Sequence, residues 1–231
     1  MFKKLFIVAA ASTAVTPAVF AADLYTPVAD PPVYTASGFD WTGIYAGAVG
    51  GYVWGRSTST PTTGGATTTI DPSGGQIGAT AGVNGQFDQF VLGLEGEILW
   101  SGASGSAQIA GAAATDIATV KSDWQGAIKA RAGVAFDQVL IYAHGGFAFT
   151  DYYAKADLAG VFEGDYRTSR TGWTIGAGVE MAVTENVTVK AEYAYSDFGK
   201  WTGTVAGGAA AGDYEFTHHT HAIKAGVNFH F

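Results

Sequence analysis

From Trp41 to the last residue of the chain, apolar residues alternate with polar or small residues in one segment after another. Residues 90–100 are the clearest case: Phe90, Leu92 and Leu94 lie on one face, and Glu95 and Glu97 on the other. A period of two is the signature of a β-strand whose two faces meet different surroundings. This pattern therefore predicts an all-β fold built from strands with one apolar face.

Eight segments follow the pattern, and their length matches the roughly 9 to 11 residues that a tilted strand needs to cross a membrane. Short turns are predicted at 88–89, 137–138 and 184–186, and long Gly-, Ala-, Thr- and Ser-rich connections at 55–75, 101–122, 150–170 and 198–216. This asymmetry is typical of outer-membrane barrels. We predict an eight-stranded antiparallel up-and-down transmembrane β-barrel with four long extracellular loops and short periplasmic turns. The segments are 43–54, 76–87, 90–100, 124–136, 139–149, 171–183, 187–197 and 223–231.

Charged side chains of the strands lie on the face opposite the apolar set. Because eight strands enclose a lumen just wide enough for side chains, we expect the apolar face to contact lipid and the charged face to fill the lumen. Four acidic and four basic residues predict a neutral network of cross-strand ion pairs, with Glu95–Arg131, Glu97–Lys129 and Glu180–Lys190 at matching heights. The predicted network is Glu95, Glu97, Lys129, Arg131, Glu180, Lys190, Glu192 and Lys224.

Large aromatic residues fall at both ends of the predicted strands, with small aliphatic residues between them. Bilayer interfaces favour such girdles, whereas a soluble barrel has no need of them. The long-loop girdle is predicted to be Trp54, Trp100, Trp124, Phe149, Trp173 and Tyr195, and the short-turn girdle Phe87, Phe90, Phe136 and Phe229, followed by the terminal Phe231.

The N-terminal residues predict an export signal. Lys3 and Lys4 precede a short apolar core, and small residues favour cleavage after Ala21. The core is too short for an uncleaved membrane anchor. We expect a signal peptide over 1–21, a proline-containing periplasmic linker over 22–40 and the barrel over 41–231. The chain has no cysteine, which excludes disulfides and thiolate metal sites, and its net charge of −8 argues against nucleic-acid binding.

Several motifs together resemble the alphaproteobacterial outer-membrane porin-family surface antigens, which are related to the opacity-type barrels and include immunogenic and haemin-binding proteins. The resemblance implies an eight-stranded barrel in the cell outer membrane, surface exposure and antigenicity. It also implies that the barrel-assembly machinery reads the C-terminal strand ending at Phe231, and that host or envelope ligands meet the long loops. The motifs are AADL (21–24), WTGIY (41–45), FVLGLEGE (90–97), GWTIGAGVE (172–180), VKAEY (189–193) and VNFHF (227–231).

Few residues suggest chemistry. His218, His219 and His221 cluster where the last strand begins, as in a metal or haem site, although a polar strand end is the simpler interpretation. His144 and Ser196 fall on the lumenal face without a partner that would make them catalytic. We therefore expect no enzyme activity and no cofactor. The preferred function is a structural and surface-interaction protein with a filled lumen, and the alternative is a small-solute porin or a haemin-binding surface protein.

Overall fold

The computed structural model describes residues 38–109, 116–158, 162–205 and 212–231. The predicted signal peptide and most of the predicted linker lie outside the described residues. No helix among the described residues is long and apolar enough to cross a membrane. The strands are β1 (Gly43–Pro61), β2 (Thr68–Ile70), β3 (Ser73–Phe87), β4 (Phe90–Gln108), β5 (Asp116–Phe136), β6 (Val139–Leu158), β7 (Phe162–Ala182), β8 (Val187–Val205) and β9 (Gly212–His230).

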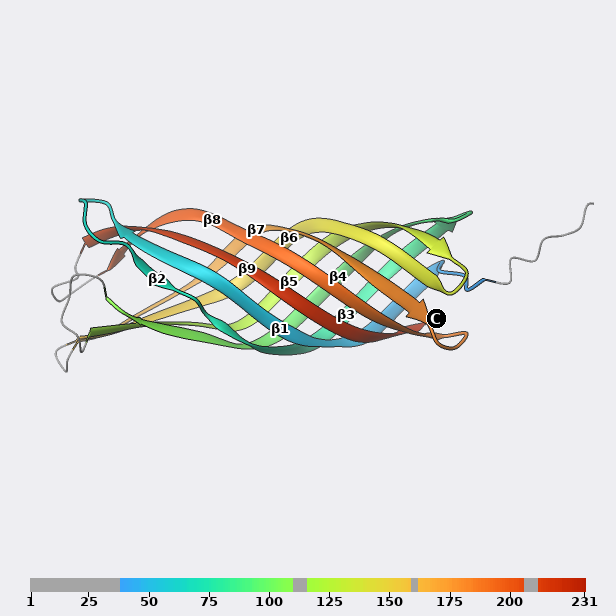
Figure 1. Ribbon diagram of the computed structural model, residues 1–231, viewed down its shortest axis with the longest axis horizontal. Helices are drawn as coiled ribbons and strands as arrows, with labels where there is room; N and C mark the ends of the chain where they lie inside the picture. Colours follow the sequence, from blue (N-terminus) through green and yellow to red (C-terminus); the bar gives the residue numbers. More distant parts are fainter. Residues whose placement is uncertain (1–37, 110–115, 159–161, 206–211) are drawn as a thin grey trace, which may run out of the picture. The chain divides into compact units, whose positions relative to one another are not determined.

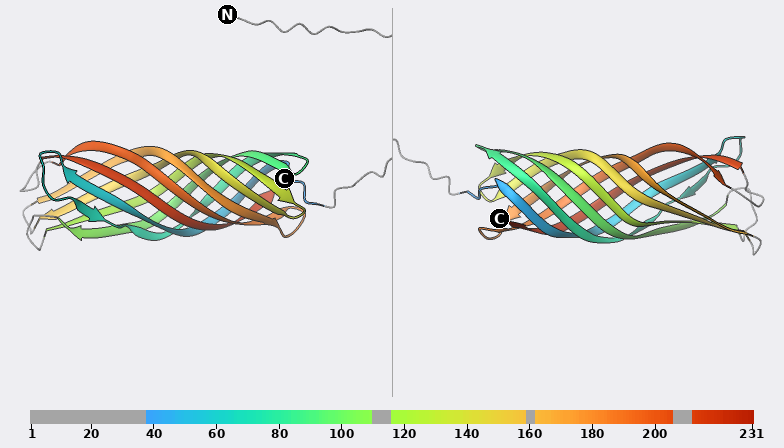
Figure 2. Two further views of the ribbon diagram at one scale, coloured as in Figure 1. Left: turned by 45° about the horizontal axis from the view of Figure 1, so that its top comes forward. Right: turned by 180° about the vertical axis from the view of Figure 1, so that it is seen from behind.

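Eight of these strands close into a ring. Strands β1, β3, β4, β5, β6, β7, β8 and β9 pair in that order, each antiparallel to the next, and β9 pairs back onto β1. The strands slant around the axis and form a continuous wall, which Figures 1 and 2 show from three directions. Strand β2 pairs with β1 alone over three residues. The predicted eight-stranded up-and-down barrel is therefore confirmed.

Tight turns join the strands at one end. Asp88 and Asp137 adopt φ angles of 54° and 51° at the two-residue turns between β3 and β4 and between β5 and β6. Aspartate tolerates this left-handed conformation because its short side chain hydrogen-bonds to nearby backbone. A third short connection joins β7 to β8, as the sequence predicts.

The apolar face of the strands is the outer face of the ring. Ile77 and Phe147 are each 69% exposed, whereas Glu95 on the opposite face is 2% exposed. Trp100 and Trp124 are partners on neighbouring strands at one end of this face, and Phe87 and Phe90 are partners at the other. The outer surface thus presents a band of aliphatic residues between aromatic ends, as a bilayer requires.

The prediction of four long loops is wrong for most of the residues assigned to them, because these residues form strands. The strands run well past the long-loop girdle: β4 continues to Gln108, β5 starts at Asp116, and β6 and β7 stay paired up to Leu158 and Phe162. The alternation fades there because neither face of these segments meets lipid. The backbone ladder continues all the same, since each strand has an antiparallel neighbour to pair with. We call these outgrowths the extended end of the barrel.

Two pairs of neighbouring strands stop hydrogen-bonding to each other in the extended end, and we call each of these gaps a seam. Strands β7 and β8 pair only as far as Trp173 and Asp197, and β3 and β4 only as far as Ser73 and Ser104. Beyond the long-loop girdle the ring therefore divides into two sheets, β2-β1-β9-β8 and β4-β5-β6-β7. Strand β2 contacts β4 and covers the second seam.

Lumen-facing glycines allow neighbouring backbones to approach closely. A Cβ added at Gly78 would overlap the carbonyl oxygen of Ile98, whereas a Cβ at Gly75 would meet nothing. We expect Gly78→Ala to prevent or strongly slow barrel closure, because backbone cannot move aside as a flexible side chain does. Gly75→Ala is the matched control and should fold normally. Heat-modifiable gel mobility after refolding into micelles measures both, and equal folding yields would contradict the prediction.

Candidate functional site

The lumen is filled in layers, and its middle holds all eight charged residues of the predicted network. Each of them is buried inside the ring. We call this set the charge layer: Glu95 and Glu97 on β4, Lys129 and Arg131 on β5, Glu180 on β7, Lys190 and Glu192 on β8, and Lys224 on β9.

Lys129 is the hub of the charge layer. Its Nζ lies 2.8 Å from Glu95 Oε1, 2.9 Å from Glu192 Oε1 and 3.4 Å from Glu97 Oε2. Lys224 Nζ completes this side, at 2.6 Å from Glu97 Oε1 and 2.9 Å from Glu192 Oε1. Each ammonium therefore serves more than one carboxylate, which is how buried charges of both signs are accommodated in a narrow space.

Arg131 and Lys190 form the other side of the charge layer. Arg131 Nη2 lies 2.6 Å from Glu180 Oε2, and Nη1 lies 3.4 Å from Glu95 Oε2. Lys190 Nζ lies 2.8 Å from Glu95 Oε2. The structure brings together Glu95 with Arg131, as predicted, but Lys190 reaches Glu95 on the far wall in place of Glu180 on the neighbouring strand. A lumen this narrow lets long side chains pair across it.

Neutral donors complete the coordination of the carboxylates. Tyr45 Oη donates to Glu95 at 2.7 Å, and Tyr142 Oη donates to Glu192 at 3.0 Å. Thr188 Oγ1 and Asn228 Nδ2 donate to Glu180 at 2.6 and 2.7 Å. These partners were not predicted from the sequence, although their positions on the lumenal face of the strands could have identified them.

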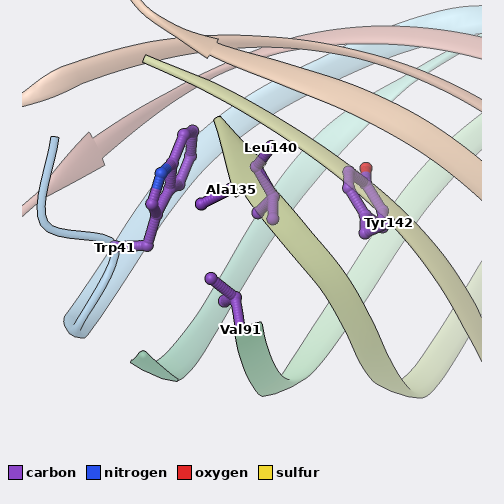
Figure 3. Close-up of a cluster of buried hydrophobic side chains, with 5 residues drawn as sticks. All are labelled: Trp41, Val91, Ala135, Leu140 and Tyr142. Atoms are coloured by element: carbon purple, nitrogen blue, oxygen red, sulfur yellow. The ribbon is translucent and has the colours of Figure 1, made fainter. Parts of the chain in front are cut away.

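An apolar plug closes the short-turn mouth of the lumen. Trp41 belongs to one cluster of buried side chains with Val91, Ala135, Leu140 and Tyr142, and Figure 3 shows these five residues. Trp41 and Leu140 are both fully buried. We call these five residues the Trp41 plug. Strand alternation could have revealed it, because Val91 and Leu140 are apolar residues on the otherwise polar face.

Phe39 fastens the chain to this mouth. Its ring packs edge-on against Trp41, with centroids 4.8 Å apart, and its backbone N–H donates to the Asp137 carbonyl oxygen at 3.2 Å. Phe39 belongs to the segment that the sequence analysis assigned to a linker over 22–40. The contacts of the barrel thus begin at least two residues before Trp41.

A second apolar cluster lies at the extended end, beyond the long-loop girdle. Ile70, Val120, Tyr152 and Trp201 pack together there from four different strands. We call these four residues the outer cluster. Between it and the charge layer lies a cavity of about 30 Å³ lined by Gln76, Gln125 and Thr220 among others. That volume is enough for about one water molecule.

The three histidines of β9 do not share a site. His218 points inward, is buried and hydrogen-bonds to Ser57 Oγ at 2.7 Å, whereas His221 hydrogen-bonds to Tyr193 Oη on the exposed outer face at 2.7 Å. His219 lies on the outer face with His221, with ring centroids 6.1 Å apart. Within the described ranges, no group of three His, Asp or Glu side chains is arranged to hold a metal ion.

His144 and Ser196 are not paired either. His144 Nε2 lies 3.4 Å from Glu192 Oε1, and Ser196 Oγ donates to Thr174 Oγ1 at 3.0 Å. Both side chains are thus engaged with other partners, and His144 and Ser196 do not form the hydrogen-bonded pair of base and nucleophile that catalysis would need.

His218 provides a pH-dependent contribution to stability at the extended end. Burial lowers its pKa from 6.5 to about 4, with the neighbouring His219 as a lesser cause. The folded state disfavours the protonated imidazole of His218, so protons bind more readily to the unfolded chain. The stability that neutral His218 contributes is therefore full above about pH 6.5 and is lost as the pH falls towards 4. We expect the melting temperature of the His218→Gln variant to fall less than that of the wild type over this range. Parallel curves would contradict the assignment.

Comparisons with known proteins give one consistent result. Residues 8–231 match the family model described as "Outer membrane protein beta-barrel domain". The 25 kDa outer-membrane immunogenic protein of Brucella abortus is 32% identical, over 99% of this chain and 98% of its own length. The 22 kDa outer membrane protein of Rhizobium leguminosarum is 29% identical, over 83% of this chain and 78% of its own length. The crystal structure of OprG from Pseudomonas aeruginosa matches with a TM-score of 0.56 at 16% identity, covering 84% of this chain and 99% of OprG.

Proposed function

Because the chain belongs to the family of outer-membrane protein β-barrel domains, we propose that it is a structural and surface-interaction protein whose lumen is sealed. It resides in the outer membrane, like the relatives that carry that location in their names. Its outer face meets lipid, and its extended end faces the exterior of the cell, as in other barrels of this kind.

One observation carries this proposal: buried side chains occupy the lumen at three successive levels. The Trp41 plug, the charge layer and the outer cluster follow one another along the axis, and each is built from buried residues. Eight-stranded barrels have interiors that side chains can fill completely. These levels favour a rigid membrane-spanning support over a porin, since a solute would have to displace all three.

The extended end supports a role at the cell surface. Relatives in five Brucella species are named 25 kDa outer-membrane immunogenic proteins, and they are 32–34% identical to this chain. Such a name fits a protein whose surface meets the host. The paired strands beyond the long-loop girdle are the part of this barrel that would do so.

Site-directed labelling tests the surface role. The chain has no cysteine, so a single introduced cysteine is a unique target. Thr202 on the extended end and Gln138 in a short turn are both exposed. A membrane-impermeant maleimide should label Thr202→Cys on intact cells and should label Gln138→Cys only after the outer membrane is permeabilised. The opposite pattern, or equal labelling of both variants on intact cells, would refute the proposed orientation.

A further inference from the structure

The seam between β7 and β8 leaves two facing strand edges unpaired at the extended end, residues 162–172 of β7 and residues 198–205 of β8. Strands β8 and β9 remain paired from Lys200 with Thr217 up to Val205 with Gly212. On its other side, in the part of the chain that the structure describes, β8 has no strand partner beyond Asp197. Every second residue of such an edge directs its N–H and C=O groups away from the sheet. The edge is thus a template for one more strand.

Features that hinder pairing with another strand lie at the start of the unpaired part of β8, but its remaining residues have none of them. A register shift lies between Asp197 and Lys200, and Gly199 between them has a φ of 71°. Bulges and lysines of this kind are common protection against edge pairing. Residues 201–205 carry no charge and read WTGTV, a composition rich in strand-forming residues.

The two faces of this edge differ in chemistry. Trp201 points inward into the outer cluster and packs against Phe216 with ring centroids 5.7 Å apart. Thr202 and Thr204 are exposed on the outer face, where Thr204 Oγ1 donates to Asp213. An added strand would therefore place one row of side chains beside the apolar cluster and the other row in water.

One side chain bridges the seam where backbone pairing is absent. The guanidinium of Arg170 on β7 lies over the Trp201 ring, 4.5 Å from its centroid. Trp201 is buried, so this cation–π contact is shielded from water and is stronger than one on the protein surface. Arg170 therefore helps to close the seam, and a strand that adds along β8 has to displace it.

We propose that the outer edge of β8 binds an extended segment of a partner protein by strand addition, with alternating apolar and polar side chains in that segment. Main-chain hydrogen bonds supply the affinity in this mode of recognition, and the alternate side chains supply the specificity. The proposal rests on the surface role, because the partner must reach the extended end from outside the cell.

A peptide pair tests the proposal directly. The probe is a peptide of alternating valine and threonine flanked by lysines, and the control is the same peptide with alternate backbone amides N-methylated. Hydrogen exchange of the full chain in micelles should slow at residues 198–205 with the probe and stay unchanged with the control. No protection, or equal protection by the methylated peptide, would overturn the proposal.

Two variants extend this test. Arg170→Ala should bind the probe about five- to thirtyfold more tightly, the ratio that corresponds to the loss of a partly buried cation–π contact. Arg56→Ala removes an exposed arginine that is ion-paired with Asp71 away from the seam, and it should leave binding unchanged. Equal effects of both variants would contradict a site at the seam. If Thr202→Cys is labelled on intact cells but the probe gives no protection, strand addition fails and the surface role stands.

Discussion

Lys129→Met is expected to destabilise the folded barrel by about 3–5 kcal/mol, because it leaves a cluster of buried carboxylates without their shared counter-ion. Lys129 Nζ lies within 3.4 Å of three of them, Glu95, Glu97 and Glu192. Methionine has nearly the same volume as lysine, so the change removes charge and little packing. Urea-dependent unfolding in lipid vesicles, followed by gel mobility, measures the difference in the free energy of unfolding.

An exposed lysine provides the matched control. Lys200 pairs with Glu215 at 2.9 Å, but both side chains are about half exposed or more. Ion pairs in water contribute about 0–1 kcal/mol, so Lys200→Met should leave unfolding almost unchanged. If Lys129→Met were as harmless as Lys200→Met, the charge layer would not be the interdependent network that its distances indicate.

Trp41→Ala is expected to destabilise the barrel by a similar amount, about 3–5 kcal/mol, because it empties the short-turn mouth. Trp41 is fully buried and packs against Phe39 and the residues of the plug. Trp100→Ala is the control, since Trp100 is 61% exposed on the lipid face and its loss leaves no cavity inside the lumen. Unfolding curves of the two variants in the same vesicles provide the comparison.

The Trp41→Ala variant also distinguishes the contribution of the plug to stability from its contribution to blocking ions. We expect the variant to remain closed to ions, because the charge layer blocks the lumen independently. A variant that is as stable as Trp100→Ala would mean that the plug does not hold the mouth together. A variant that is unstable and also conducts would mean that the charge layer is not a barrier by itself.

The sequence predicted the parts of the fold that repeat. Strict alternation along β4 and β9 located the strands, their inner and outer faces and the short turns, because a one-residue slip would turn every side chain to the wrong face. Alternation did not locate the parts of the strands beyond the membrane, where the two faces no longer meet lipid on one side and the lumen on the other. Residues 101–108 have no apolar stripe and were assigned to a loop, yet they form the outer part of β4.

The charged residues of the lumen were identifiable from their position on the strands, but not every pairing among them was. Height along the barrel placed Glu95 near Arg131, which are on adjacent strands. It could not predict that Lys190 would reach Glu95 from β8, because that contact depends on the width of the lumen. Strand periodicity places Val91 and Leu140 of the Trp41 plug on the lumenal face, but it carries no information about Trp41 itself, which precedes β1 and folds back onto them.

The central inference is that side chains seal the lumen, and ion conductance tests it most directly. Purified wild-type protein should be inserted into a planar bilayer, with insertion verified independently by protease protection in matched vesicles. We expect no steady single-channel current at any voltage that the bilayer tolerates. A reproducible open level in the wild-type protein would contradict the sealed lumen and favour the small-solute porin.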